Sequence, residues 1–216
     1  MGLDAEKFQM TEDKLTVIGN SEKYTDEYSY NNALPTWSNH YLWPLLANLV
    51  DSFELNEKSV FEIGCGNGAT ASMLSGLGFD VTGIDPSESG IAQANQAYPK
   101  ITLEVGSSYE DLSSLYGTFP LVVSLEVIEH CYAPRRFIST FADLIAPGGT
   151  GIISTPYHGY FKNLALAVSG KLDAHFTALW DGGHIKFFSI KTLHELLTAQ
   201  GFSDIQFHRV GRIPLL

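Results

Sequence analysis

The chain has 216 residues, 44% of them hydrophobic, and its 24 acidic residues against 13 basic ones give a formal charge of −11. This length and composition suit one globular α/β domain, and the acidic charge argues against nucleic acid as a partner. The two cysteines, without paired spacing, give no sign of a disulfide framework. Residues 1–10 lack the apolar stretch of a secretory signal, and no uncharged run has the length of a membrane span, so we expect a cytoplasmic protein.

Hydrophobic periodicity predicts an N-terminal helix followed by alternating strands and helices. A polar segment, residues 1–30, precedes a helix that begins near Asn39 and runs to Val50. We then predict strands at 59–63, 79–84, 101–105, 120–125 and 149–154, helices at 68–77, 87–97 and 134–145, and a helical turn at 109–115. The strands are near-continuous apolar runs, which is typical of a sheet covered on both faces. The expected fold is therefore a three-layer α/β/α domain with a doubly wound, mostly parallel sheet.

Residues 156–186 interrupt this alternation. The segment is too long for a plain loop in a compact domain, which predicts a lid or substrate-binding insertion. Ser189 then caps a helix over 190–200 that Gly201 ends, a further strand is expected at 202–208, and 213–216 is where a last strand would begin. Residues 1–216 thus form one domain, with a cap segment at 1–56, a core at 57–155 and 187–210, and the insertion between them.

Residues 60–68, Val-Phe-Glu-Ile-Gly-Cys-Gly-Asn-Gly, carry the strongest functional signal. An apolar strand ends in three alternating glycines, which adopt backbone angles closed to other residues and let a ligand approach the main chain. The helix that follows presents its free amides and positive dipole end to that ligand. Asp85 ends the second strand, where a carboxylate can accept hydrogen bonds from both hydroxyls of a ribose. The pattern predicts a nucleoside site, with a plain tight turn as the alternative.

The same loop satisfies the loose dinucleotide pattern Gly-x-Gly-x-x-Ala, so NAD is one alternative. Three features argue against it. Glu62, two residues before the first glycine, would repel a pyrophosphate but suit a cation. The third glycine keeps the alternating spacing, and Ala146-Pro147-Gly148-Gly149 is predicted to end a helix and precede a strand.

With these motifs the chain resembles the class I S-adenosylmethionine-dependent methyltransferases. The resemblance is carried by residues 62–68, 83–87, 121–130 and 145–154, and it resumes around 182–207. It implies S-adenosylmethionine as cofactor, a small-molecule acceptor, and cofactor-binding roles for Glu62, Gly64, Cys65, Gly66 and Gly68 at the methionine portion, Asp85 at the ribose, Pro86 beside the adenine, and Leu125 and Glu126 next to the methyl group. Related enzymes place an acidic residue near the adenine amine after the third strand, where this chain has Ser107 and Ser108. Ser108 would supply a weaker contact there, and Glu110 or Asp111 is the alternative. A structural carboxylate is the alternative for Glu62.

Residues 125–130, Leu-Glu-Val-Ile-Glu-His, resemble the ubiquinone-biosynthesis O-methyltransferases more than methyltransferases at large. In that group a Glu-x-x-Glu-His pattern is associated with a divalent cation, which implies Glu126, Glu129 and His130 as ligands of an ion such as Mg²⁺. Such an ion would lower the pKa of an acceptor phenol. The alternatives are that Glu129 and His130 brace the corner after the strand, or act on a proton themselves.

The insertion adds further candidates. His184 follows Asp181-Gly182-Gly183, a sequence typical of a tight turn, and is the first choice for a general base; His130 and Glu129 are the further catalytic candidates. A structural role is the alternative for each histidine. Apolar residues of 161–172 share one helical face, which predicts a lid, a helix packed on the domain, or a weak contact with lipid.

We therefore expect transfer of a methyl group to a hydroxyl oxygen of a small molecule. An N- or C-methyltransferase with the same cofactor site is the closest alternative. An NAD-dependent oxidoreductase and a non-catalytic nucleoside-binding module are alternatives from other classes. The chain is also expected to form a homodimer, and we expect no nucleic-acid partner.

Overall fold

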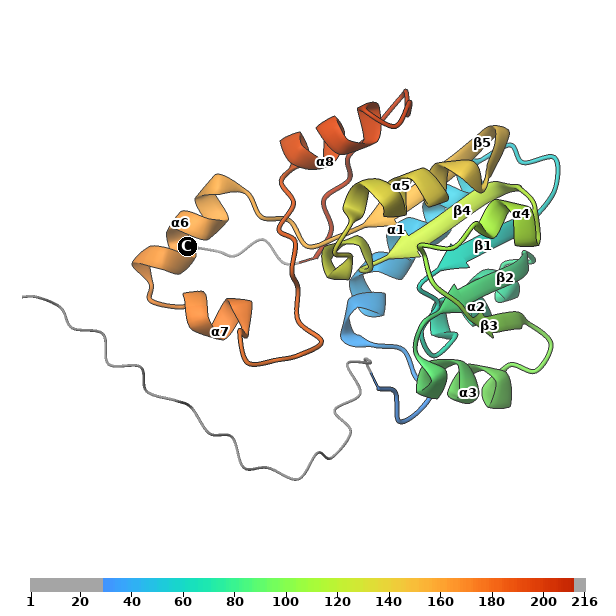
Figure 1. Cartoon of the computed structure of the whole chain (residues 1–216), viewed down its shortest axis with the longest axis horizontal. Coiled ribbons are helices and arrows are strands. Elements are labelled where there is room, and N and C mark those ends of the chain that lie inside the picture. Colours follow the sequence, from blue (N-terminus) through green and yellow to red (C-terminus); the bar gives the residue numbers. More distant parts are fainter. Residues whose placement is uncertain (1–28, 212–216) are drawn as a thin grey trace, which may run out of the picture.

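The computed structural model describes residues 29–211 and has a parallel sheet at its centre (Figure 1). The strands are β1 (Ser59–Ile63), β2 (Asp80–Asp85), β3 (Thr102–Val105), β4 (Phe119–Leu125) and β5 (Ile145–Ser154). The helices are α1 (Trp37–Ser52), α2 (Ala69–Gly76), α3 (Glu88–Ala97), α4 (Leu112–Tyr116), the 3₁₀ turn η1 (Ile128–His130), α5 (Pro134–Asp143), α6 (Tyr160–Val168), α7 (Leu172–Phe176) and α8 (Ile190–Thr198). The expected last strand at 213–216 and most of the polar segment 1–30 lie outside the described residues.

The strand order is β3-β2-β1-β4-β5, and every pairing is parallel. The chain winds outward from β1 in one direction to β3 and then crosses to β4 on the other side. The switch in direction lies between β1 and β4, and in open α/β sheets the crevice at the carboxyl ends of such strands is where ligands bind. The predicted parallel α/β architecture is confirmed.

Two clusters of buried side chains cover the two faces of the sheet. One contains Leu46 and Val50 of α1 with residues of α2 and α3, and it packs on strand residues such as Val60 and Val123. The other contains residues of α4, α5 and α8 with alternate residues of the same strands, such as Phe61 and Val122. Successive side chains of a strand point to opposite faces, so one apolar run supplies both clusters. The result is the predicted three-layer arrangement.

Two expectations about the end of the core are corrected. Residues 202–208 form no strand, because Asp204 has a φ of 52° and turns the chain in the middle of the expected extended run. Asp tolerates this left-handed conformation better than most residues. Residues 146–149 do not precede a strand but lie within β5, where pairing passes from Phe119–Ile145 directly to Leu121–Thr150. The Pro-Gly-Gly sequence therefore forms an irregularity at the start of that strand, with Gly148 at a φ of 79°.

The insertion forms the short helices α6 and α7, which stand to one side of the sheet (Figure 1). The expected helical run 161–172 is divided, because Gly170 has a φ of 67° between the two helices. At the base of the insertion, His158 N–H donates to Phe188 O at 2.8 Å. Neither α6 nor α7 has a fully buried residue. Within residues 29–211, no helix combines the length and the apolar character needed to cross a bilayer.

Candidate active site

The glycine loop connects β1 to α2 at the carboxyl edge of the sheet. Gly64, Gly66 and Gly68 all have positive φ, at 80°, 53° and 76°. Gly66 N–H donates to Asp85 Oδ2 at 2.9 Å, and Ser87 N–H donates to Asp85 Oδ1 at 2.8 Å. Both oxygens of this carboxylate are thus oriented by main-chain amides at the tip of β2. The structure brings the loop and Asp85 together as the sequence predicted.

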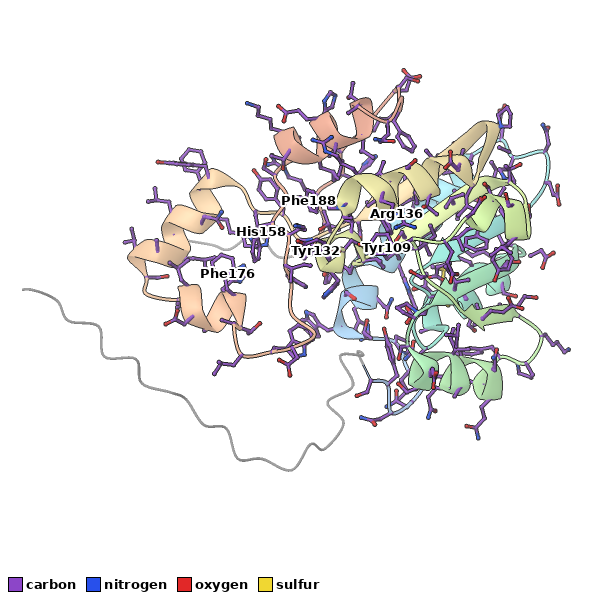
Figure 2. All side chains as sticks on the ribbon, viewed as in Figure 1. Tyr109, Tyr132, Arg136, His158, Phe176 and Phe188 are labelled. Carbon is purple, nitrogen blue, oxygen red and sulfur yellow. The ribbon has the colours of Figure 1, made fainter. Side chains whose placement is uncertain are left out.

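A cavity of about 330 Å³ lies beside this loop, across the carboxyl ends of β1 to β4. Its lining is mostly apolar: Ile63, Gly64, Ile84, Pro86, Gly106, Ser107, Ser108, Tyr109, Val127, His130, Cys131 and Tyr132. Tyr109 is held against the start of α5, since its hydroxyl accepts from Ala133 N–H and Arg136 lies over its ring (Figure 2). A pocket with apolar walls and a few polar groups suits a planar heterocycle. Four of the predicted cofactor residues, Gly64, Pro86, Ser107 and Ser108, line it.

Glu62 lies behind the glycine loop and is only 2% exposed. Its Oε2 atom has no hydrogen-bond partner among the described residues. Burial, with the charge of Asp85 as a second cause, raises the pKa of Glu62 to about 8. A buried carboxylate without a partner is costly unless a cation or donor meets it, so the site fits a ligand with an ammonium group. Cys65 is buried, and burial raises the pKa of its thiol, so this residue contributes main chain rather than a thiolate.

Glu126 follows β4, on the other side of the switch point, in a strained backbone conformation. Its φ is 57°, which is uncommon for a residue other than glycine and concentrates at functional sites. Ser154 Oγ donates to Glu126 Oε1 at 2.8 Å, while Glu126 N–H donates back to Ser154 Oγ at 3.0 Å. The carboxylate also lies near the hydroxyl of Tyr41 in α1, close enough for each group to affect the pKa of the other. Burial, together with Glu126 and Glu129, raises the pKa of Tyr41 to about 12.

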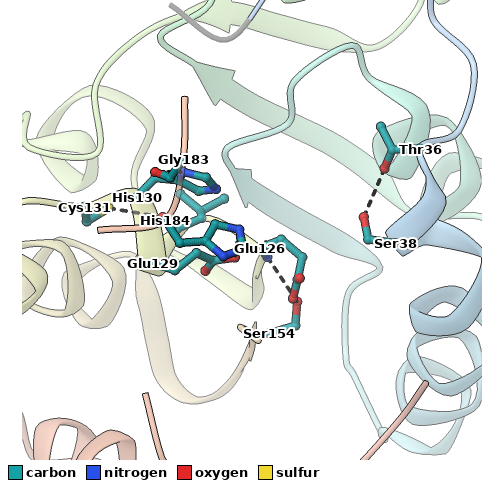
Figure 3. Close-up of polar contacts among 10 residues, drawn as sticks. Thr36, Ser38, Glu126, Glu129, His130, Cys131, Ser154, Gly183 and His184 are labelled. Carbon is teal, nitrogen blue, oxygen red and sulfur yellow. Dashed lines mark hydrogen bonds and ion pairs between the residues drawn. The ribbon is translucent and has the colours of Figure 1, made fainter. Parts of the chain in front are cut away.

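Glu129, His130 and His184 form a compact cluster next to Glu126 (Figure 3). One ligand atom from each of the three lies within 4.8 Å of the others. His184 Nε2 is 4.0 Å from Glu129 Oε1, and His130 Nδ1 is 3.2 Å from Gly183 O. The main chain at the end of the insertion is held next to this cluster, because the N–H groups of Ile185 and Lys186 both donate to Glu129 O at 2.9 Å.

The charges of this cluster are set mainly by burial. Glu129 is 1% exposed, and neither carboxylate oxygen has a hydrogen-bond partner among the described residues. Burial first, and then the nearby Glu126, raise the pKa of Glu129 to about 8. Burial lowers the pKa of His130 and of His184. The cluster therefore holds a carboxyl group whose pKa lies near neutral pH, where catalytic acids and bases operate, beside two imidazoles whose pKa values are lowered.

The cluster differs from the expected ligand set. Glu126 lies beside Ser154 and Tyr41, and His184 takes the place in the cluster where the sequence analysis expected Glu126. The sequence analysis gave Ser154 no role. Its position at the end of β5, the strand that pairs with β4, could have indicated that it lies near Glu126. Leu125 ends β4 and is half-buried beside the core.

The other two histidines of the insertion pack among aromatic rings. His158 stacks on Phe176 with 5.8 Å between ring centroids, and His175 and Phe187 lie within 5.5 Å of it (Figure 2). Burial lowers the pKa of His158 to about 4, which keeps the ring neutral. These contacts support a packing role for His158 and His175. Of the three histidines, His184 is the one that meets the acidic residues.

The known proteins that this chain resembles include methyltransferases, both by sequence and by structure. A family model described as a methyltransferase domain matches residues 38–206. The chain is 36% identical over 125 residues to a ubiquinone biosynthesis O-methyltransferase of Caulobacter sp. (strain K31), covering 56% of this chain and 48% of that protein. It is 28% identical over 153 residues to the protein of that name from Cereibacter sphaeroides, covering 68% and 60%. The chain spans about half the length of the curated relatives it matches first.

Solved structures share the fold at low identity. Magnesium protoporphyrin IX methyltransferase from Synechocystis, solved with bound SAH, has a TM-score of 0.59 and 22% identity, covering 75% of this chain and 72% of that one. A SAM-dependent methyltransferase from Archaeoglobus fulgidus has a TM-score of 0.57 and 19% identity, covering 76% and 68%. The family model spans most of the described residues, including the glycine loop, Asp85 and the Glu129 cluster. The chain belongs to the methyltransferase-domain family.

Proposed function

We propose that this domain is an S-adenosylmethionine-dependent methyltransferase that methylates a hydroxyl oxygen of a small molecule. The observation that carries the choice of oxygen is the contact between the buried Glu129, just beyond the tip of β4, and the partly exposed His184, whose Nε2 atom is 4.0 Å from Glu129 Oε1. A hydroxyl must lose its proton to become a good nucleophile, whereas a neutral amine can attack without a base. The O-methyltransferase names of the relatives agree with this choice.

The chain's own groups match the parts of the cofactor. Glu62 would meet the ammonium, Asp85 the ribose hydroxyls, and the cavity lined by Pro86 and Ser107 the adenine. When bound, the cofactor supplies a methyl group on a sulfonium centre, and the protein supplies position and exclusion of water. Glu62 also argues against NAD, because its carboxylate would face a pyrophosphate.

We propose His184 as the acceptor of the hydroxyl proton and Glu129 as the group that stabilises it. With a raised pKa on Glu129 and a lowered pKa on His184, both are neutral near pH 7. As the pH approaches about 8, Glu129 ionises and can hold His184 as an imidazolium after it has taken the proton. Activity should therefore rise as the pH approaches that value.

The same cluster offers the ligand types of a divalent cation. One carboxylate and two imidazoles suit a transition metal such as Zn²⁺ or Mn²⁺, whereas Mg²⁺ prefers oxygen ligands. A cation there would lower the pKa of an acceptor hydroxyl. In that arrangement Glu129, His130 and His184 are the ligands, and Glu126 remains with Ser154 and Tyr41.

The test is a screen of phenols, catechols and amines with an isotopically labelled methyl donor, followed by identification of the methylated atom. Glu129→Gln and His184→Ala should each lower the rate about 100-fold or more, with affinity for adenosylhomocysteine unchanged. The matched control is His194→Ala, an exposed histidine of α8, which should leave the rate as it is. A product methylated at nitrogen, or full activity in Glu129→Gln, contradicts the proposal. Loss of activity in chelator that Mn²⁺ or Zn²⁺ restores supports the metal, and unchanged activity rejects it.

A further inference from the structure

Residues 30–36, which we call the N-terminal strap, precede α1 and are bound to the glycine loop and α3. Its hydrogen bonds run from Asn67 Nδ2 to the carbonyl oxygens of Asn32 and Leu34, from the Tyr98 hydroxyl to Ala33 O, and from Tyr30 N–H to Ser89 Oγ, at 2.9 to 3.1 Å. Asn67 is itself part of the glycine loop. The loop therefore uses the side chain of Asn67 to hold the strap beside it.

Tyr30, at the start of the strap, has its ring packed closely against Gly66 of the glycine loop and Gly90 of α3. A Cβ atom added to Gly66 would overlap the Tyr30 hydroxyl and lie 2.8 Å from Cζ. A Cβ atom added to Gly90, in α3, would lie 2.9 Å from Tyr30 Cδ2. Real Cβ atoms do not approach so closely, so the ring fits only because both positions are glycine.

The position of Tyr30 relative to Asp85 indicates which half of the cofactor it would meet. The hydroxyl lies at Gly66, whose amide donates to Asp85 Oδ2. The cavity assigned to the adenine lies on the side of Pro86 and Ser107, and Tyr30 is not among its lining residues. Tyr30 thus lies on the side of the ribose and the amino-acid portion.

The charges of this half of the site favour a hydroxyl donor. Residues 59–99, which build β1, β2, α2 and α3, contain no Lys or Arg, yet they include Glu62 and Asp85 next to the loop. The cofactor's amino-acid portion carries a carboxylate, which needs hydrogen-bond donors in such surroundings. Main-chain amides at the start of α2 are one source, and the Tyr30 hydroxyl, which lies at Gly66 in the loop before that helix, is a side-chain donor.

We propose that Tyr30 is a cofactor-binding residue whose hydroxyl donates a hydrogen bond to the carboxylate of the cofactor's amino-acid portion. This rests on the proposed function, because it takes S-adenosylmethionine as the ligand of the cleft. The strap is then part of the cofactor site and not only a connection to α1. The sequence interpretation assigned Tyr30 no role, since nothing local in residues 1–30 indicates a ligand.

The experiment compares two nucleosides by calorimetry with the full chain. Adenosylhomocysteine keeps the amino-acid portion, and methylthioadenosine lacks it. Tyr30→Phe keeps the ring between Gly66 and Gly90 and removes only the donor. It should weaken adenosylhomocysteine about tenfold or more and leave methylthioadenosine unchanged. Tyr160→Phe, which alters an exposed tyrosine of α6, is the control and should change neither affinity.

The outcomes separate this proposal from the proposed function. Equal weakening of both nucleosides would place the hydroxyl at the ribose and overturn the carboxylate assignment. Unchanged affinity for both would overturn any contact by the hydroxyl. If the wild-type chain binds neither nucleoside, the cofactor assignment itself fails. Unliganded thermal unfolding of Tyr30→Phe, matched to the wild type, shows that the change in affinity is not a loss of fold.

Discussion

Gly64, the first glycine of the loop, has a φ of 80°, and a Cβ atom added there would overlap Val127. Gly64→Ala should lower the free energy of unfolding by about 1–2 kcal/mol or more from backbone strain alone, and it should weaken adenosylhomocysteine because the loop must shift. Urea unfolding and calorimetry measure the two effects. Gly76→Ala is the matched control: Gly76 lies in α2, and its added Cβ would meet open space. Equal effects of the two substitutions would contradict this account.

Glu129 makes the stability of the protein depend on pH. Its pKa is raised from 4.5 to about 8, so the folded chain keeps a proton that the unfolded chain releases. The contribution of this group is complete below pH 4.5 and is lost as the pH rises through about 8. The free energy of unfolding should therefore fall over this interval, and less steeply in Glu129→Gln.

Urea unfolding at several pH values tests this, with Glu57→Gln as the control. Glu57 is exposed, so its substitution should leave the slope against pH as in the wild type. Glu62, whose pKa is also raised to about 8, should add to the wild-type slope in the same direction. A Glu129→Gln slope equal to that of the wild type would show that the carboxylate is not desolvated.

At the scale of elements, α8 shows how a helix is attached to the core. Leu193 and Leu196 are buried and belong to the cluster that contains Phe141 of α5. Leu196→Ala should lower the free energy of unfolding by about 2–4 kcal/mol, because it leaves a cavity where α8 meets α5. Leu164→Ala, at an exposed position of α6, should have a much smaller effect. Urea unfolding of both variants measures these effects, and a similar loss of unfolding free energy in the two would mean that α8 is not packed as described.

The two ends of α8 could be predicted from the residues next to them. Ser189 Oγ accepts from Thr192 N–H, and Gly201 follows the helix with a φ of 87°, so both ends of α8 were predictable from residue type. The conformation of residues 202–208, after the helix, could not be predicted in this way. Asp204 interrupts a run that is apolar enough for a strand, and propensity alone does not tell whether an Asp turns the chain.

At the scale of the whole molecule, α6 places an apolar surface far from the core. Phe161 is 84% exposed and Val168 is 82% exposed, on a helix without buried residues. The lipid contact expected for residues 161–172 remains a prediction. Neutral phosphatidylcholine vesicles should bind the chain weakly, and anionic vesicles should not improve binding, because the chain carries a formal charge of −11.

Co-sedimentation measures this contact. Phe161→Asp should reduce the fraction bound, because it places a charge in the buried face of an interfacial helix. Leu115→Asp changes an exposed leucine of α4 and is the matched control. Equal binding by the wild type and Phe161→Asp would reject a role for this helix at a membrane.

Residue types and their local spacing were enough to predict the features that depend on neighbouring residues. Alternating glycines can bend a chain only in certain ways, and Asp85 is the last residue of its strand, so the glycine loop beside Asp85 was predictable along with the parallel sheet. These features follow from backbone angles and from burial of short apolar runs, which are local properties.

The contacts between residues that are distant in the sequence depend on how the whole chain folds. His130 and Gly183 are 53 positions apart, and they touch because the main chain of residues 185–186 bonds to Glu129. This contact puts His184, instead of Glu126, beside Glu129, while α1 carries Tyr41 to Glu126. No local pattern encodes such pairs, because they depend on strand order and on how the insertion returns to the core.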